Sequence, residues 1–222
     1  MDYMLLASAP LFCGNTQQEI KDMLICLHAK ERVYKKSEII YRAGEQIREL
    51  GLVLSGSVSI EQDDLWGNRT ILDRVEPGRV FAESYACAPG EALMVNVVAL
   101  ETTCVLFMDI QNILHVCSSA CGYHLKLVHN LLSITAQKNL NLSRRSLHTA
   151  PKSIRGRVLS YLSFQALQQG GRDFQIPFNR QQLADYLNVE RSALSAELSK
   201  MRQDGLLTFE KNHFVVADQI ES

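Results

Sequence analysis

The sequence predicts an α+β fold in three parts: an N-terminal antiparallel β jelly roll in residues 1–121, a long helix in residues 122–147, and a C-terminal winged helix-turn-helix in residues 148–222. Three patterns support this division. Short β-branched runs alternate with turn residues up to about residue 108, apolar residues then recur at heptad spacing, and two short amphipathic runs flank an asparagine near the C-terminal end. With 222 residues, of which 46% are hydrophobic, the chain is long enough to bury two cores.

Composition and the first residues narrow the class of protein. The chain has no run of about eighteen apolar residues, so we expect no membrane span. The opening MDYMLLASAP lacks the basic start and long apolar core of a signal peptide, so we expect a cytoplasmic protein whose six cysteines are reduced thiols. The net charge is −1, and residues 151–222 carry nine basic against eight acidic residues. Nucleic-acid binding therefore has to be argued from where the charges lie, because their sum does not indicate it.

The N-terminal part begins with a helix signal and continues as strands. Thr16 and Glu19 form a Thr-x-x-Glu capping box, which predicts the first helix of the chain. From about residue 31 to residue 108 the runs EIIYRAGE, LGLVLSGSVSIEQ, RTILDRVEPG, MVNVVAL and TTCVLFM resemble strands, with turns expected at Ser55-Gly56 and Trp66-Gly67-Asn68. Many short strands at regular spacing predict an antiparallel sandwich or jelly roll.

A long dimerisation helix is expected from about Gly122 to Leu147, ending before a proline at position 151. A heptad of core positions runs along it, formed by Leu125, Val128, Leu132, Thr135, Asn139 and Leu142. So narrow a seam suits the pairing of two helices, and asparagine at a core position favours a parallel pair in one register, which predicts a homodimer. The alternative is an ordinary amphipathic helix, since Leu131 and Ile134 lie off the seam. We expect one face to meet a partner helix and the other to pack on its own domain.

A helix-turn-helix pattern follows the proline. Residues 153–168 are predicted to form a helix that ends at Gly170-Gly171, and Asn179 begins the next helix as its N-cap. Asn188 stands where a left-handed turn residue is needed, and Val189 follows it as an apolar plug. Apolar residues supply the inner faces of the two helices around this turn: Leu183, Ala184, Leu187, Leu194, Leu198 and Met201. A small residue, a turn residue and an apolar plug at these spacings predict a helix-turn-helix.

Two further strands and the polar start of the second helix favour DNA binding. The pieces LLTFE and HFVV join at Lys211-Asn212 and predict a wing. The alternative is a helical hairpin used only for packing, but the wing and the exposed position expected for Arg191 argue against it. Arg191 can contact a base edge, while Arg180 and Gln181, at the start of the preceding helix, can touch phosphates. The candidate DNA-binding residues are Asn179, Arg180, Gln181, Arg191, Ser192, Ser195 and Lys200.

Both halves of the chain resemble one family. The runs PKSIRGRVLSYL and IPFNRQQLADYLNVERSALSAELSKMRQDGLL resemble the C-terminal domain of the CRP/FNR family of bacterial transcription regulators. The strand pattern, SGSV and PGRVFAE resemble the cyclic-nucleotide-binding jelly roll of that family, so residues 1–121 are expected to form a sensor domain. The resemblance implies a homodimer formed through the long helix, binding to a near-palindromic double-stranded operator, and it allows RNA polymerase as a further partner.

The first departure from the family pattern concerns the second helix of the helix-turn-helix. Family members commonly follow the first arginine of this helix with Glu-Thr and carry a second arginine five residues after the first. Here Ser192 and Ala193 follow Arg191, and Ala196 stands where the second arginine is expected. Arg191 can still contact a guanine edge, but we expect the operator sequence to differ from the usual one of the family.

The second departure concerns the sensor pocket. Members that respond to cyclic nucleotides hold the ribose and the cyclic phosphate with a Gly-Glu pair and an Arg-Ser or Arg-Thr pair. Here Glu83 follows Ala82, and Met94 and Val95 fall near the place of the lost arginine pair. A buried phosphate without a cationic partner is costly, so we expect an unidentified effector other than cyclic AMP. The candidate pocket consists of Glu83, Ser84, Tyr85, Met94 and Val95.

The sequence gives weaker signals for a metal site, a redox site or an enzyme. A redox, metal or haem site is conceivable where histidines and cysteines lie closest together, at His115, Cys117, Cys121 and His124. These residues match no accepted ligand spacing, so we expect buried cysteines and neither a metal nor a cofactor. No glycine-rich phosphate loop, nucleophile elbow or metal-hydrolase motif is present, so we do not expect an enzyme. A ligand-binding module that does not bind DNA remains as a third class.

Overall fold

The computed structural model describes residues 1–64, 66, 68–114 and 122–217. They form two compact units, Met1–Gln137 and Lys138–Ser222, which divide within the long helix α5 (Gly122–Thr149). Residues 138–149 of α5 therefore belong with the C-terminal unit. In the described part of the chain, no helix is both long enough and apolar enough to cross a membrane.

The first unit opens with a helical layer. It consists of α1 (Tyr3–Ser8), the 3-10 turn η1 (Pro10–Phe12) and α2 (Gln17–Cys26). The predicted capping box of α2 is confirmed, because the Thr16 hydroxyl accepts from the Glu19 amide while the Glu19 carboxylate accepts from the Thr16 amide. The expectation that this helix is the first of the chain is wrong. Helix α1 precedes it and is capped by Asp2, which accepts hydrogen bonds from two amides of the first turn.

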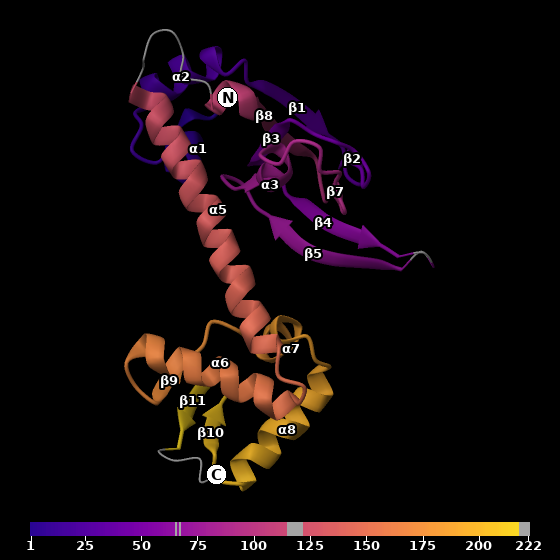
Figure 1. Ribbon diagram of the computed structural model, residues 1–222, viewed down its shortest axis with the longest axis vertical. Helices are drawn as coiled ribbons and strands as arrows, with labels where there is room; N and C mark the ends of the chain where they lie inside the picture. The colour runs from indigo at the N-terminus through magenta and orange to yellow at the C-terminus, as the bar shows by residue number, and fades with distance from the viewer. Residues whose placement is uncertain (65, 67, 115–121, 218–222) are drawn as a thin grey trace. The chain divides into compact units, whose positions relative to one another are not determined.

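Two four-stranded antiparallel sheets follow and confirm the predicted jelly roll (Figure 1). The first sheet has the order β1 (Lys30–Tyr34), β8 (Thr103–Asp109), β3 (Glu49–Ser55), β6 (Val80–Phe81). The second has the order β2 (Ile39–Tyr41), β7 (Asn96–Ala99), β4 (Val58–Asp63), β5 (Arg69–Val75). The expected turn at Ser55-Gly56 is present, with Gly56 at φ +76°, whereas the second expected turn includes Gly67, which lies outside the described residues.

The two central strands of the first sheet, β3 and β8, are buried on both faces, which explains their nearly continuous apolar sequences. On β3, Leu50 and Leu52 face the helical layer, while Val53 faces the second sheet. On β8, Leu106 also faces the helices and Phe107 faces the second sheet. Because side chains alternate along a strand, one apolar run can serve two cores at once.

Aromatic rings pack in the space between the two sheets. Tyr34 and Tyr41 each pack edge-to-face against Phe107, with ring centroids 6.2 and 5.8 Å apart, and Tyr41 also meets Phe81 at 6.3 Å. The Phe81 ring lies directly over Gly51, where a Cβ atom would come within 2.2 Å of it. A glycine on this strand therefore makes room for the ring, and side chains occupy this part of the jelly roll's interior.

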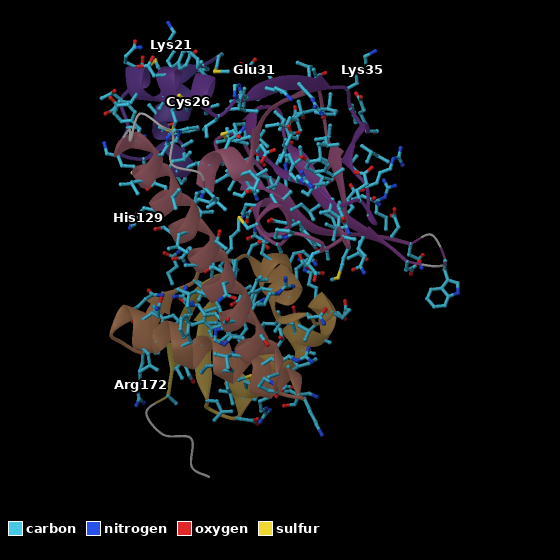
Figure 2. The ribbon with its side chains drawn as sticks, turned by 45° about the horizontal axis from the view of Figure 1, so that its top comes forward. Lys21, Cys26, Glu31, Lys35, His129 and Arg172 are labelled. Atoms are coloured by element: carbon cyan, nitrogen blue, oxygen red, sulfur yellow. The ribbon has the colours of Figure 1, made fainter. Side chains whose placement is uncertain are left out.

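Helix α5 presents two different faces, as its sequence predicts. Leu131 is buried in the first unit together with Leu127, while the seam residues Leu125, Leu132 and Leu142 are 68%, 66% and 67% exposed. His129 also points away from the helix (Figure 2). The off-seam face thus packs on its own domain together with the seam residue Val128, while the three seam leucines stay at the surface. Two short helices, α3 (Glu83–Ala86) and α4 (Ile110–Leu114), complete the first unit.

The C-terminal unit is a winged helix-turn-helix. It consists of α6 (Ile154–Gln169), β9 (Asp173–Gln175), α7 (Arg180–Leu187), α8 (Arg191–Gln203), β10 (Leu207–Glu210) and β11 (His213–Val216). Strand β9 pairs with β11 and extends the predicted two-stranded wing to three strands. The sequence pattern misses β9 because only Phe174 of its three residues is buried, which is too short a run to show a period.

Candidate DNA-binding surface and effector pocket

The turn between α7 and α8 has the predicted geometry. Asn179 caps α7 and forms a reciprocal capping box with Gln182, and Asn188 is left-handed at φ 53° and ψ 54°. All six residues predicted for the inner faces are buried in one core: Leu183, Ala184, Leu187, Leu194, Leu198 and Met201. Val189 packs against the edge of the same core. The positions of α7 and α8 are therefore fixed by a cap, a left-handed turn and an apolar interior.

Glu190 caps the second helix, a role that the sequence analysis did not assign. Its carboxylate accepts from the Ala193 amide at 2.9 Å and from the Ser192 hydroxyl. The bond from that hydroxyl, followed by the backbone bonds of Ser192 and Ala193, lowers the pKa of the Glu190 carboxyl below its ordinary value. The acidic residue immediately before α8 could have been recognised as an N-cap signal. The Ser192 hydroxyl is thereby directed at the capping carboxylate of α8.

The exposed face of α8 is polar but carries few charges. Arg191, Ser192, Ala196 and Lys200 are exposed, whereas Ser195 is partly buried. The Ser195 hydroxyl donates to the Arg191 carbonyl at 2.9 Å within the helix. Arg191 at the first turn and Lys200 further along thus mark the two ends of a largely uncharged stripe.

The wing is joined to α7 and α8 through stacked cations. The Arg180 guanidinium lies over the Phe209 ring at 4.9 Å and over the Phe214 ring at 5.9 Å, and Arg202 lies over Phe209 at 5.3 Å. Burial lowers the pKa of the Arg180 guanidinium relative to its ordinary value. Arg180, predicted to be a phosphate contact, is therefore half-buried, and it also holds β10 and β11 in place.

A pair of carboxylates from α8 ties this helix to α6. Arg155 Nε donates to Glu197 Oε1 at 2.7 Å, and Arg155 Nη2 lies 2.7 Å from Asp204 Oδ2. The side-chain bond to Glu197 and then that to Asp204 raise the pKa of the Arg155 guanidinium. This cluster could not be predicted from the sequence, because its members are far apart along the chain and show no local pattern.

A buried histidine lies where α5 meets α6 and α7. His148 is 3% exposed, and its ring lies 5.6 Å from Tyr161, 5.2 Å from Phe164 and 6.1 Å from Tyr186. Its Nδ1 bonds to the Ser160 hydroxyl at 3.1 Å, while Nε2 has no hydrogen-bond partner in the described part of the chain. Desolvation lowers the pKa of His148 below 6.5.

This burial predicts a pH dependence of the C-terminal unit. A histidine whose folded-state pKa is lowered stabilises the fold fully above pH 6.5, and this stability is lost as the pH falls, by at most about 1.4 kcal/mol per pH unit. Replacing the imidazole in His148→Phe is expected to flatten the dependence between pH 7 and pH 5. Urea unfolding followed by the NMR ring signals of Tyr161 and Tyr186 measures it. An equal slope in parent and variant would contradict this prediction.

Of the predicted effector residues, Glu83, Ser84 and Tyr85 lie on α3, and Met94 and Val95 lie in the segment before β7 (Asn96–Ala99). Ala82 precedes this helix at φ 62°, a left-handed position that favours glycine, and Glu83 is 3% exposed. Tyr85 and Met94 are brought together, because the Met94 amide donates to the Tyr85 hydroxyl at 3.4 Å. Met94 is nevertheless 72% exposed, so its side chain is not enclosed. Ser84, on α3, is exposed, and Val95, next to Met94, is partly buried.

The two arginines of β5, Arg69 and Arg74, are paired with carboxylates. Arg69 lies 3.2 Å from both Glu61 and Asp63, and Arg74 pairs with Glu76 at 2.8 Å. Each of these cations already faces a carboxylate, which leaves less of its charge for a buried phosphate. A separate open surface cavity of about 500 Å³ contains none of the predicted effector residues and is lined by Tyr41, Glu45, Gln46, Ile47, Arg48, Glu49 and Asp109.

The proposed metal or haem ligands fall mostly outside the described residues. This applies to His115, Cys117 and Cys121, whereas His124 lies on α5 and is buried. Cys26, at the end of α2, is exposed at the surface (Figure 2). Within the described ranges, no three histidine, cysteine or acidic side chains come together in a way that could hold a metal ion.

Comparison with protein families gives two matches that together span most of the chain. Residues 31–120 match the cyclic nucleotide-binding domain, and residues 156–219 match the Crp-like helix-turn-helix domain. A cyclic-nucleotide-binding-type jelly roll followed by a winged helix-turn-helix defines the class of one-component regulators. The chain belongs to the CRP/FNR family of transcription regulators. This confirms the resemblance seen in the sequence.

Individual relatives agree with this assignment. The chain is 29% identical over 208 residues to the cyclic AMP receptor protein of Thermus thermophilus, covering 91% of this chain and 89% of that protein. The structure of the Thermus thermophilus catabolite activator protein has a TM-score of 0.52 at 23% identity, covering 95% and 94% of the two chains. The c-di-GMP responsive regulator CLP of Xanthomonas campestris has a TM-score of 0.54 at 18% identity, covering 92% of this chain and 100% of CLP. At these identities the two structures show the common fold alone.

Proposed function

We propose that this transcription regulator acts as a homodimer on a near-palindromic operator and responds to an effector other than cyclic AMP. The observation that carries the proposal is the polar face of α8, which begins with the exposed Arg191 and lies on a rigid three-helix core. A helix presented in this way fits the major groove of DNA. The functional division that we propose is a sensor in residues 1–121, a dimerisation helix in residues 122–147 and a DNA-binding domain in residues 148–222. Because the proposed partner is operator DNA, we also propose that the protein is cytoplasmic.

The exposed seam of α5 supports the dimer. Leu125, Leu132 and Leu142 expose two thirds of their surface, although they lie on the same helix as fully buried leucines. Val128 and Thr135 are partly buried and Asn139 is exposed on the same helix. A second copy of α5 would cover this stripe and bury its apolar surface. Two copies of α8 would then face two half-sites, which is why we expect an inverted repeat.

The DNA contacts follow from the placement of the side chains. Arg191 has the reach and the donor pattern to bind guanine O6 and N7. Asn179, Arg180 and Gln181 lie at the amino end of α7, where backbone amides also favour a phosphate. The remaining proposed contacts of α8 are Ser192, Ser195 and Lys200. The low charge of its central stripe indicates that shape and apolar contact contribute to recognition alongside Arg191.

Selection from random duplexes tests the DNA-binding proposal. The full chain is incubated with a pool of random double-stranded DNA at physiological salt, and the retained duplexes are amplified and sequenced. We expect enrichment of an inverted repeat whose half-sites lie about 34 Å apart, one turn of the double helix. Retention without enrichment of any sequence, or no retention, would contradict the proposal and favour a ligand-binding module.

The charges around the candidate effector pocket disfavour cyclic AMP. The cyclic phosphate carries a full negative charge, which a buried site normally offsets with a paired arginine. In this chain Met94 is exposed and Val95 partly buried near that position, and the β5 arginines Arg69 and Arg74 are paired with acidic side chains. One relative is named for binding cyclic AMP, but this chain lacks the arginine pair that the family pattern places at the cyclic phosphate.

Isothermal titration calorimetry tests the effector proposal. Cyclic AMP and cyclic GMP are each titrated into the full chain, and the operator affinity is measured with and without each nucleotide. We expect no heat of binding at micromolar nucleotide and no change in operator affinity. Micromolar binding that also changes the operator affinity would show that other donors replace the missing arginine.

A further inference from the structure

Two arginines from different helices converge on the carboxyl end of α7. Arg145, on α5, donates from its Nη2 atom to the Asp185 carbonyl at 2.9 Å and from Nε to the Tyr186 carbonyl at 3.1 Å. Arg157, on α6, donates from Nη1 to the carbonyls of Leu187 at 3.1 Å and Asn188 at 2.8 Å. Four consecutive carbonyl groups, from residue 185 to residue 188, are therefore bound by two guanidinium groups.

These carbonyls are the groups that a helix end leaves without full satisfaction. The last carbonyls of a helix lack the usual amide donor four residues further on, and they form the negative end of the helix dipole. Here the Asp185 carbonyl also accepts from the Asn188 amide at 3.3 Å. A guanidinium group offers several N–H donors in one plane together with a positive charge, which suits adjacent carbonyls. The two arginines thus stabilise the end of α7 both by hydrogen bonds and by charge.

The same contacts tie the turn to its surroundings. Arg157 Nε also donates to the Pro151 carbonyl at 2.9 Å, which connects the turn to the loop before α6. The Arg145 guanidinium lies 6.0 Å from the centre of the Tyr186 ring, on α7 itself. The clamped segment ends at Asn188, and the cap of α8, Glu190, is only two residues further on.

We propose that Arg145 and Arg157 are positioning residues that set the orientation of α8 for sequence-specific DNA binding, which rests on the proposed function. Both guanidinium groups direct donors at protein carbonyls, so they act through the turn, without contacting the phosphates of DNA. Their loss leaves the charges of the DNA-binding surface in place but lets the turn move. Discrimination between operator and random DNA then falls, while the electrostatic attraction to any DNA persists.

The first test needs no DNA. Amide hydrogen exchange is measured on the full-length parent, Arg145→Gln and Arg157→Gln. The matched control is Arg144→Gln, because Arg144 bonds to Asn141 on its own helix at 3.3 Å and lies over the Phe164 ring. We expect exchange at the amides of residues 187–190 to be at least about tenfold faster in the first two variants and unchanged in the control. Unchanged exchange in Arg145→Gln and Arg157→Gln would overturn the proposal, whether or not the protein binds DNA.

The second test compares operator and random duplexes by fluorescence anisotropy at several salt concentrations. We expect about tenfold weaker operator binding in each glutamine variant, with random-duplex affinity and the slope of log K against log salt unchanged. Arg145→Lys and Arg157→Lys keep the charge and one donor, so they should recover part of the loss and also serve if a glutamine variant does not fold. A fall for both duplexes, with a slope smaller by about one, would mean a phosphate contact and overturn the proposal. A parent that binds no DNA, yet shows the expected exchange pattern, would overturn only the proposed function.

Discussion

Leu198→Ala is expected to lower the free energy of unfolding of the C-terminal unit by about 2–5 kcal/mol. Leu198 is fully buried in the core that joins α6, α7 and α8. Removing its side chain loses apolar burial and leaves a cavity among helices that the turn and the Arg155 cluster hold in place. Because a small domain is stable by only about 5–15 kcal/mol, a loss of this size is a large fraction of the total.

Leu167→Ala is the matched control, because Leu167 lies on α6 of the same unit and is 83% exposed. The same chemical change there is expected to alter the free energy of unfolding by less than about 0.5 kcal/mol. Native-state hydrogen exchange of the α8 amides in the full chain measures both variants without assuming that the two units unfold together. Equal effects at the two leucines would contradict the described core.

Arg191→Ala is expected to weaken operator binding by about 1–3 kcal/mol and to relax the sequence preference at one base pair of each half-site. Arg191 is exposed at the first turn of α8, and the second arginine common in the family is replaced by Ala196. We therefore expect direct base recognition to depend strongly on one guanidinium group. Selection from random duplexes with the variant would show which position becomes degenerate.

Lys200→Ala provides the contrast on the same helix. Lys200 is exposed, and as a flexible point charge we expect it to contact a phosphate. Its loss should weaken operator and random duplexes alike and reduce the salt slope by about one. If Arg191→Ala also weakens both kinds of duplex equally, Arg191 does not contact a base, and the assignment of α8 as the recognition helix loses its main support.

Local patterns allowed much of the fold to be predicted. The Asn179 cap, the Asn188 turn and the buried face of α8 each depend on neighbours within a few residues, and all are found as expected. The two faces of α5 were also predictable, because the periodicity of a helix puts Leu131 on a different face from the seam leucines.

What the sequence did not indicate depends on contacts between distant residues. Arg155 reaches Glu197, Arg157 reaches the end of α7, and Arg180 stacks on the wing. No spacing rule distinguishes these arginines from exposed ones, because only the packing of the helices brings their partners near. Such contacts position the surface that the local patterns identify.

The candidate effector pocket was also only partly predictable from the sequence. The sequence shows that no arginine lies in the loop after α3. The exposure of Met94 and the pairing of Arg69 are visible only in the fold. The left-handed Ala82 shows that the backbone geometry expected of a glycine is kept although the glycine is not. The left-handed turn before α3 is thus present, while the segment between α3 and β7 carries no arginine.

Sedimentation velocity of the full chain with the selected duplex tests the central claim most directly. The measurement gives the number of chains on one inverted repeat and, without DNA, the oligomeric state at micromolar concentration. We expect a dimer in both cases and two chains on each duplex, because pairing of two α5 helices through their exposed seam would bring one α8 to each half-site. A monomer that binds the inverted repeat tightly as a single chain would contradict it.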